Sequence, residues 1–186
     1  MWPVMKTLYS ENLILRPVKR ADIPDLSRML ADPVTTKYLF GGEPMSSGQA
    51  KDFITSHFSS KEDDGFGMGT AVDSATDRFV GFAGLVPSEY PGGKDLELGF
   101  AKASWVQRSK FGKEIGKRQI VFGFDELNCD RLLALVHPLN DPSIHVLKEN
   151  LKMKWLEKIT TDERGERDVY SLDRGTYLQT SAYYRQ

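Results

Sequence analysis

The chain has 186 residues, of which 40% are hydrophobic and 11% aromatic, and its formal net charge is −1. This length suits one domain, the apolar content excludes a disordered chain, and the charge gives no overall field to recruit nucleic acid. The single cysteine, Cys129, excludes an intrachain disulfide and a multi-cysteine metal site. No apolar run is long enough to cross a membrane, and the first residues lack a signal-peptide pattern, so we expect a cytoplasmic protein.

The first half of the chain predicts a strand, two helices and a pair of strands. A helix is expected to begin at Asp22 and to tolerate Pro24 in its first turn. Ser46 and Gln49 have the spacing of a capping box, in which a hydroxyl and an amide side chain bond the first free N–H groups of a helix. The predicted strands are residues 8–18, 66–72 and 78–86.

The second half predicts strands that alternate with helices and end in a hairpin. A helix is expected over residues 113–127, and Asn140 is expected to cap a short second helix. The continuous apolar run at residues 131–137 is typical of a strand buried on both faces. The other predicted strands are residues 96–101, a segment that starts between 151 and 155, and 167–172. The order of elements predicts an α/β sandwich around a mixed sheet.

A basic segment joins the strand at 96–101 to the helix that follows it. Its basic residues are Lys102, Arg108, Lys110, Lys113, Lys117 and Arg118, with Glu114 as the one acid. Free N–H groups and the positive end of a helix dipole favour a phosphate there, and a solvated helix face is the alternative. Gly112 would let a ligand approach the backbone closely, or would only serve the turn. Six basic residues in a chain without net positive charge do not favour a nucleic-acid site.

Three motifs follow one another in a recognisable order. They are Leu98-Gly99-Phe100, the run Gln107-Arg108-Ser109-Lys110-Phe111-Gly112, and the turn His137-Pro138-Leu139-Asn140-Asp141-Pro142-Ser143. Together they resemble the core of the GNAT superfamily of acyl-CoA-dependent N-acetyltransferases. The pattern is most similar to the branch of ribosomal-protein N-terminal acetyltransferases, the Rim type. The similarity covers about residues 8–172, and residues 173–186 are expected to be a C-terminal tail.

The resemblance implies a single N-acetyltransferase domain over residues 1–186. It further implies a mixed, mostly antiparallel sheet splayed between the fourth and fifth strands, with a bulge that exposes amides and with helices on both faces. Acetyl-CoA would be the cosubstrate, with no metal. The residues that would hold it are Gly99, Phe100, Ala101, Gln107, Arg108, Ser109, Lys110, Phe111, Gly112, Lys113, Asn140 and Ser143. Lys110 stands where the family usually has glycine, which raises the alternative of a domain that binds acyl-CoA without turnover.

Acetyl transfer to an amine needs a proton acceptor, donors for the carbonyl oxygen and a proton for the departing thiolate. Glu97, on the strand before Leu98, is our first candidate for the base, with an exposed strand carboxylate as the alternative. Asp162 is the second candidate, with a plain surface turn as its alternative. The resemblance places Ser143 near the thioester sulfur. The acceptor is expected to be a protein N-terminal α-amine or a small amine. It is expected to bind around residues 37–47 and 160–168. The expected oligomeric state is a monomer or a homodimer.

Overall fold

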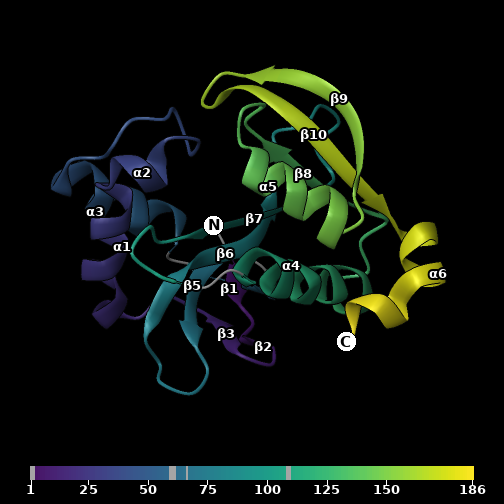
Figure 1. The fold of residues 1–186 in the computed structure, drawn as a ribbon, viewed down its shortest axis with the longest axis horizontal. Helices are drawn as coiled ribbons and strands as arrows, with labels where there is room; N and C mark the ends of the chain where they lie inside the picture. Colours follow the sequence, from purple (N-terminus) through teal and green to yellow (C-terminus); the bar gives the residue numbers. More distant parts are fainter. Residues whose placement is uncertain (1–2, 59–61, 66, 108–109) are drawn as a thin grey trace.

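The computed structural model describes residues 3–58, 62–65, 67–107 and 110–186, and a mixed sheet runs through its centre (Figure 1). In this part of the chain eight strands pair in the order β2-β3-β5-β6-β7-β8-β10-β9. Their bounds are β2 (Leu8–Tyr9), β3 (Leu13–Arg16), β5 (Gly67–Asp73), β6 (Phe79–Pro87), β7 (Leu96–Lys102), β8 (Arg131–Val136), β9 (Lys154–Thr161) and β10 (Gly165–Asp173). Every pairing in this sheet is antiparallel except that of β7 with β8, so the predicted mixed, mostly antiparallel sheet is confirmed. Two short strands, β1 (Pro3–Met5) and β4 (Glu62–Gly65), pair in parallel with each other.

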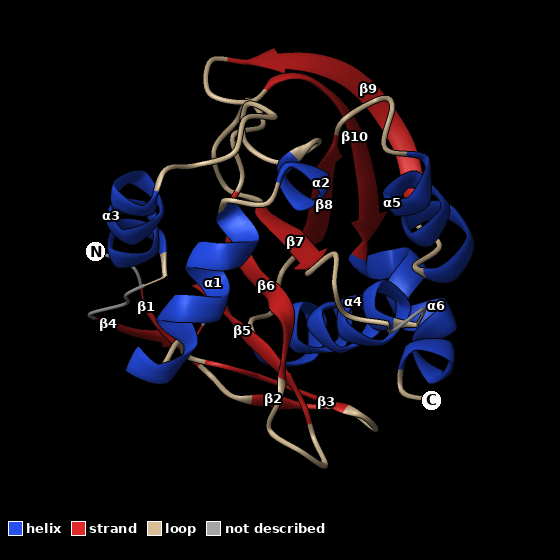
Figure 2. Cartoon of the chain, turned by 60° about the vertical axis from the view of Figure 1, so that its left-hand side comes forward, coloured by secondary structure: helices blue, strands red, loops and turns tan. Residues whose placement is uncertain are grey.

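Helices cover both faces of the sheet, as predicted (Figures 1 and 2). Their bounds are α1 (Ile23–Leu30), α2 (Pro33–Thr36), α3 (Ser47–His57), α4 (Phe111–Val121), α5 (Asp141–His145) and α6 (Arg174–Tyr184). Buried residues of α1 and α3 pack with Phe82 of the sheet in one apolar cluster, and those of α4 and α6 pack with Leu98 in another. None of the helices in the described residues is both long and apolar enough to cross a membrane.

β7 and β8 separate soon after they meet. They pair only at Leu96 with Leu132 and at Glu97 with Leu133, although β7 continues to Lys102. Residues 98–102 of β7 therefore have no partner strand on that side within the described chain, which confirms the splay between the fourth and fifth predicted strands. The expected bulge was wrong, because β7 pairs with β6 along its whole length without a register shift. The divergence of two parallel strands is enough to open the sheet.

Two predicted elements are divided in the structure. The strand expected at residues 8–18 forms β2 and β3, because the chain turns between them at residues 10–12. The Ser10 hydroxyl and the Asn12 main-chain N–H both donate to Glu114 Oε1 at 2.7 Å, which fixes this turn against α4. The helix expected at residues 113–127 is α-helical from Phe111 to Val121 and continues as a π-helical turn from Phe122 to Glu126.

The C-terminal residues, expected as a tail outside the core, form helix α6. The Asp173 carboxylate caps this helix by accepting from the Thr176 N–H at 2.8 Å, and Tyr177 is fully buried. The Tyr184 hydroxyl donates to the Leu151 carbonyl at 2.9 Å. An Asp-x-x-Thr cap and two aromatic residues on one helix face are the local signals that account for this helix.

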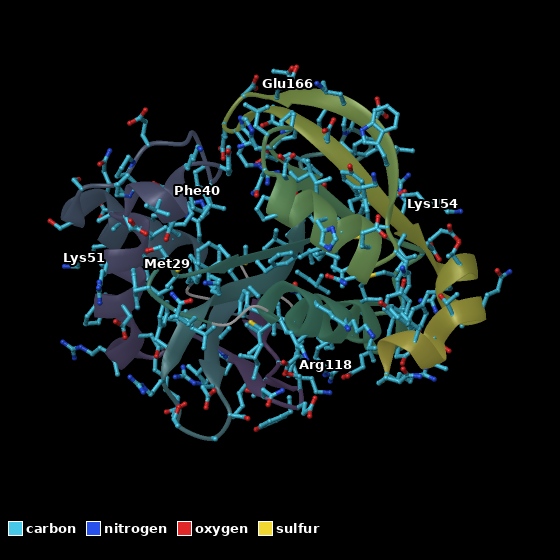
Figure 3. The ribbon with its side chains drawn as sticks, viewed as in Figure 1. Met29, Phe40, Lys51, Arg118, Lys154 and Glu166 are labelled. Carbon is cyan, nitrogen blue, oxygen red and sulfur yellow. The ribbon has the colours of Figure 1, made fainter. Side chains whose placement is uncertain are left out.

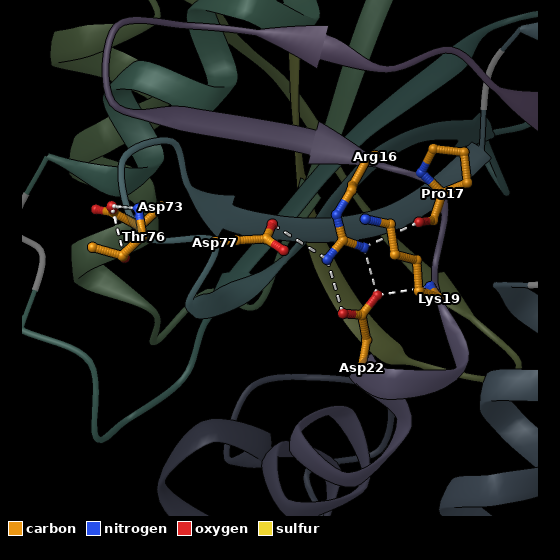
Figure 4. Close-up of polar contacts among 7 residues, drawn as sticks. All are labelled: Arg16, Pro17, Lys19, Asp22, Asp73, Thr76 and Asp77. Carbon is orange, nitrogen blue, oxygen red and sulfur yellow. Dashed lines mark hydrogen bonds and ion pairs between the residues drawn. The ribbon is translucent and has the colours of Figure 1, made fainter.

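A buried ion pair joins β3 to the start of α1 (Figure 4). Arg16 Nη1 and Nη2 donate to Asp22 Oδ2 and Oδ1 at 2.6 and 3.0 Å, and the Lys19 N–H donates to Oδ2 at 2.7 Å. Arg16 is only 8% exposed and Asp22 7%. Burial opposes ionisation of Asp22, but these hydrogen bonds and the Arg16 charge outweigh it and hold the pKa of the carboxyl below its usual range. Asp22 does precede α1 as predicted, but its carboxylate binds Arg16 and makes no side-chain cap.

Candidate functional site

A cavity of about 970 Å³ opens where β7 and β8 separate. Its lining includes residues 97–100 of β7 and 134–137 at the end of β8. Figure 3 labels Phe40, on the segment between α2 and α3, and Glu166, on the hairpin of β9 and β10. Residues of both segments line this cavity, so the structure brings together the two stretches, 37–47 and 160–168, that were expected to bind the acceptor.

A second cavity of about 330 Å³ continues from the first toward the start of α4. Residues that line it include Ala101 and Lys102 of β7 and Phe111 and Gly112 of α4. The residues that line both cavities are Tyr38, Leu39, Phe100, Asn140 and Ser143. The two cavities are therefore neighbours, and we call the pair the groove; its lining runs from the first turn of α4 to the end of β8.

Most of the predicted cofactor residues lie along this groove. Those that line it are Gly99, Phe100, Ala101, Phe111, Gly112, Asn140 and Ser143. Gln107, Lys110 and Lys113 are exposed and line neither cavity. Arg108 and Ser109 lie outside the described residues.

The first turn of α4 packs closely against β7. A Cβ atom built on Gly112 would lie 2.9 Å from Phe100 Cε2 and 3.3 Å from Val146 Cγ1, so the absence of a side chain there allows the close contact. Lys110 occupies the N-cap position with a φ of −94°, an ordinary value for any residue. The lysine at this place therefore causes no backbone strain, although the family usually has glycine.

The basic segment does not form a continuous basic surface in the described residues. Lys117 is buried, and its Nζ donates to the Tyr183 carbonyl at 2.7 Å. Lys102 Nζ donates to the Val106 carbonyl, and Arg118 Nη2 lies 3.4 Å from Glu126 Oε1. These three side chains bind other groups of the protein. The segment as a whole is therefore neither a solvated helix face nor a nucleic-acid-binding patch.

Glu97 is a buried carboxylate that faces the first cavity. It is 4% exposed, and its Oε1 and Oε2 accept from Arg164 Nη1 and Nη2 at 2.8 and 2.9 Å. Arg164 Nε also lies 3.2 Å from Glu89 Oε1. Burial opposes the charge of Arg164, but the two carboxylates outweigh it and raise the pKa of the guanidinium above its ordinary value. The alternative of an exposed strand carboxylate is wrong for Glu97.

Sequence reasoning missed Arg164. It lies in the predicted turn between the last two strands, where an arginine is unremarkable, and its partner Glu97 is 67 positions away in the chain. Asp162 lies two residues before it, exposed in the same turn, and lines the cavity that Glu97 faces. The structure thus brings both candidate bases to one cavity, one buried and ion-paired, the other at the surface.

Asn140 and Ser143 stand where the two cavities join. The Asn140 side chain accepts from the Ser143 N–H at 3.3 Å, which confirms that Asn140 caps the short helix. The Ser143 hydroxyl makes no hydrogen bond within the described residues and lines both cavities. It is therefore available to a ligand in the groove.

Other reactive side chains are engaged elsewhere. His137 Nδ1 accepts from the Leu139 N–H at 3.1 Å, and its ring centroid lies 5.1 Å from that of Tyr38. Burial raises the pKa of the Cys129 thiol, which disfavours the thiolate needed for nucleophilic attack. A search of the described residues finds no group of three or more His, Cys, Asp or Glu side chains that could hold a metal ion.

Comparisons with known proteins point to one family. Residues 12–150 match the family model described as Acetyltransferase (GNAT) domain. The chain is 29% identical over 143 residues to an uncharacterised N-acetyltransferase, p20, from Bacillus licheniformis, covering 77% of this chain and 80% of that one. Its fold is similar to a GNAT-family acetyltransferase from Bacillus anthracis, with a TM-score of 0.75, 17% identity, and 91% and 99% of the two chains covered. It is also similar to a spermidine N-acetyltransferase from Vibrio cholerae in complex with CoA and spermine, with a TM-score of 0.70, 17% identity, and 89% and 98% covered.

Proposed function

Because the chain belongs to the GNAT family of acetyltransferases, we propose that it transfers an acetyl group from acetyl-CoA to a primary amine. The observation that carries this proposal is the groove, which connects the first turn of α4 to the cavity that Glu97 faces. One end suits a phosphate-bearing cosubstrate and the other suits an amine, so both substrates can be bound at once. We propose direct attack in this ternary complex, since the described site offers no activated nucleophile.

The residues along the groove fit coenzyme A. The side of β7 that lacks a partner strand, at residues 98–102, offers main-chain groups to an extended pantetheine arm, as it would to a peptide strand. The first N–H groups of α4 have no partner within the helix and favour the pyrophosphate. Asn140 and Ser143 line both cavities, and we propose that they contact the pantetheine arm. Acetyl-CoA supplies the activated acetyl group and the thiol leaving group.

Glu97 is our proposed proton acceptor. Each of its oxygens accepts one hydrogen bond from Arg164 and retains a further lone pair for the amine or for a bridging water. Main-chain N–H groups near Gly99 and Phe100 are proposed to bind the carbonyl oxygen as it gains charge. The Ser143 hydroxyl is proposed to donate a proton to the departing thiolate. Asp162 is the alternative proton acceptor.

Two classes of amine are candidates for the acceptor. The motif order similar to the Rim-type branch favours a protein N-terminal α-amine, which is substantially neutral at physiological pH because its pKa is near 8. A small amine is the second class, and the aromatic and charged side chains that line the 970 Å³ cavity offer it binding groups. The third possibility is a domain that binds acyl-CoA without turnover.

A thiol-release assay tests the proposal. Acetyl-CoA is incubated with the protein and with peptides, polyamines or amino acids, and free thiol is measured. We expect release that depends on both the protein and one class of amine. If no amine gives release while coenzyme A still binds, the non-catalytic alternative is correct.

Replacing Gly112 by valine is expected to weaken acetyl-CoA binding by about tenfold or more, which corresponds to roughly 1.4 kcal/mol. The new side chain meets Phe100 and Val146 at 2.9–3.3 Å and pushes the first turn of α4 away from β7. Gly48→Val is a matched control, because Gly48 is also the second residue of a helix and a Cβ there meets nothing within 4 Å. Binding is measured by calorimetry. Equal affinities for the two variants would contradict the assignment of the α4 end to the cosubstrate.

A further inference from the structure

Arg167 is a buried cation that lines the first cavity. It is 3% exposed, although it lies on β10 only one residue from the surface position Glu166. The one side-chain hydrogen bond of Arg167 in the described residues runs from Nη1 to the Glu166 main-chain carbonyl at 2.7 Å. No carboxylate of the described chain lies within ion-pair distance of it, in contrast to Arg164, which has two.

This arrangement leaves the charge of Arg167 without a direct counterion. Glu89 and Glu97 are near enough to favour the charge of Arg167, but both form ion pairs with Arg164. Burial and the repulsion of Arg164 together lower the pKa of Arg167 from its ordinary value. A buried guanidinium costs stability unless an anion pairs with it. Because Arg167 is one of the residues that line the cavity, a ligand carboxylate that met its planar fork there would complete the pair.

Aromatic side chains line another part of the same cavity. Phe40 packs against Phe53 at a ring-centroid distance of 4.5 Å, and Phe58 packs edge-on against Phe82 at 5.4 Å. Phe40 adopts a φ of +45°, a left-handed conformation that is uncommon for a bulky residue, and strained residues of this kind cluster at functional sites. These rings offer an apolar surface to the body of an acceptor.

We propose that the acceptor is an amine that carries a carboxylate, which Arg167 binds, and an apolar body, which packs on the aromatic rings. An amino-acid-like molecule has this chemistry, whereas a polyamine does not. This inference rests on the proposed function, since it names the substrate class of the same site. Arg167 is then a specificity-determining residue, and Glu97 with Arg164 forms a separate ion pair in the same cavity.

The test uses two matched acceptors, phenylalanine and phenylalaninamide, which differ in the carboxylate. We expect the wild-type protein to favour phenylalanine by about 10- to 100-fold in kcat/KM, the usual range for a charge-assisted hydrogen bond. Arg167→Met is expected to remove this preference. The two acceptors also differ in amine basicity, but that difference is the same for every variant, so the change in the ratio isolates the carboxylate contact.

Two further variants keep the test interpretable. Lys158→Met is the matched control, because Lys158 lies on the same hairpin with its side chain 47% exposed and paired with Glu166. It is expected to retain the wild-type ratio. Arg167→Lys keeps the charge without the planar fork and is expected to recover part of the preference.

Thermal unfolding separates a specificity role from a structural one, since removal of a cation that lacks a counterion should leave the melting temperature of Arg167→Met unchanged or higher.

The outcomes distinguish this inference from the proposed function. A wild-type ratio near one, or a ratio that Arg167→Met does not alter, would overturn the carboxylate site while acetyl transfer itself stands. If no acceptor releases thiol, the proposed function fails, and Arg167 is then tested by calorimetry with N-acetylphenylalanine in the presence of coenzyme A. Binding that weakens about tenfold or more in Arg167→Met supports the site, and equal binding overturns it.

Discussion

Replacing Glu97 by glutamine is expected to lower kcat by about 100-fold or more, the usual contribution of a general base. Glutamine keeps the shape of the side chain but its amide cannot accept the amine proton. The Michaelis constant for acetyl-CoA should change little, because Glu97 faces the acceptor cavity and does not line the cavity at α4. Steady-state rates across a range of pH, with an acceptor found in the thiol-release assay, provide the measurement.

Asp162→Asn is the comparison that separates the two candidate bases. Asp162 is exposed in the hairpin turn, so we expect its replacement to change kcat only a few-fold. A pH–rate profile that is identical in wild type and Glu97→Gln would transfer the role to Asp162 or to bulk water. Urea unfolding of Glu97→Gln is needed beside the kinetics, because the substitution also removes one of the two carboxylates that pair with Arg164.

Asp22→Ala is expected to lower the free energy of unfolding by about 3–5 kcal/mol, since it leaves the buried Arg16 without its counterion. Asp77→Ala is the matched control. Asp77 also approaches the Arg16 guanidinium, at 3.7 Å, but its side chain is 68% exposed, so its loss should cost about 1 kcal/mol or less. The double replacement Arg16→Met with Asp22→Leu should recover most of the stability, because it removes both charges together. Urea unfolding of the four proteins gives the comparison, and equal effects of the two aspartates would contradict it.

The ion pair between Arg16 and Asp22 also makes the stability of the protein sensitive to acid. The pKa of Asp22 is lower in the folded chain than in the unfolded one, so the stabilisation is fully present above the unfolded value of about 3.9. It is lost as the pH falls through the depressed folded value. The wild-type protein should therefore lose more stability below about pH 4 than the Arg16→Met, Asp22→Leu protein, and parallel pH profiles would exclude this role.

The sequence predicted those parts of the fold that local patterns determine. The Ser46–Gln49 capping box forms as expected, with Ser46 N–H donating to Gln49 Oε1 at 2.9 Å, and the apolar run at 131–137 contains β8, an interior strand of the sheet. The splay beside β7 came from the family resemblance, and the structure confirms it. Helix α6 had usable local signals in Asp173 and Tyr177, but they follow the part of the chain that the resemblance covered.

The polar interior of the site was beyond sequence reasoning. The bond between Glu97 and Arg164 joins β7 to a hairpin turn 67 positions later, and its geometry depends on how β8 and β10 pair in between. Arg167 shows the same limit, since every residue of 162–168 except Gly165 is charged and nothing in the sequence indicates that this one is buried. Close contacts such as Gly112 with Phe100 likewise depend on how α4 sits on the sheet.

Helix α6 bears on how the protein is made during translation. Two hydrogen bonds hold it in place. Lys117 Nζ on α4 donates to the Tyr183 carbonyl, and the Tyr184 hydroxyl donates to the Leu151 carbonyl in the segment before β9. Tyr177 also fills the interior beside Phe124, with the two rings stacked at 4.6 Å. While residues 174–184 are still inside the ribosome, this side of α4 stays uncovered and its apolar residues are open to chaperones or to aggregation. The helix that begins at the groove therefore reaches its final packing only after residues 174–184 have left the ribosome.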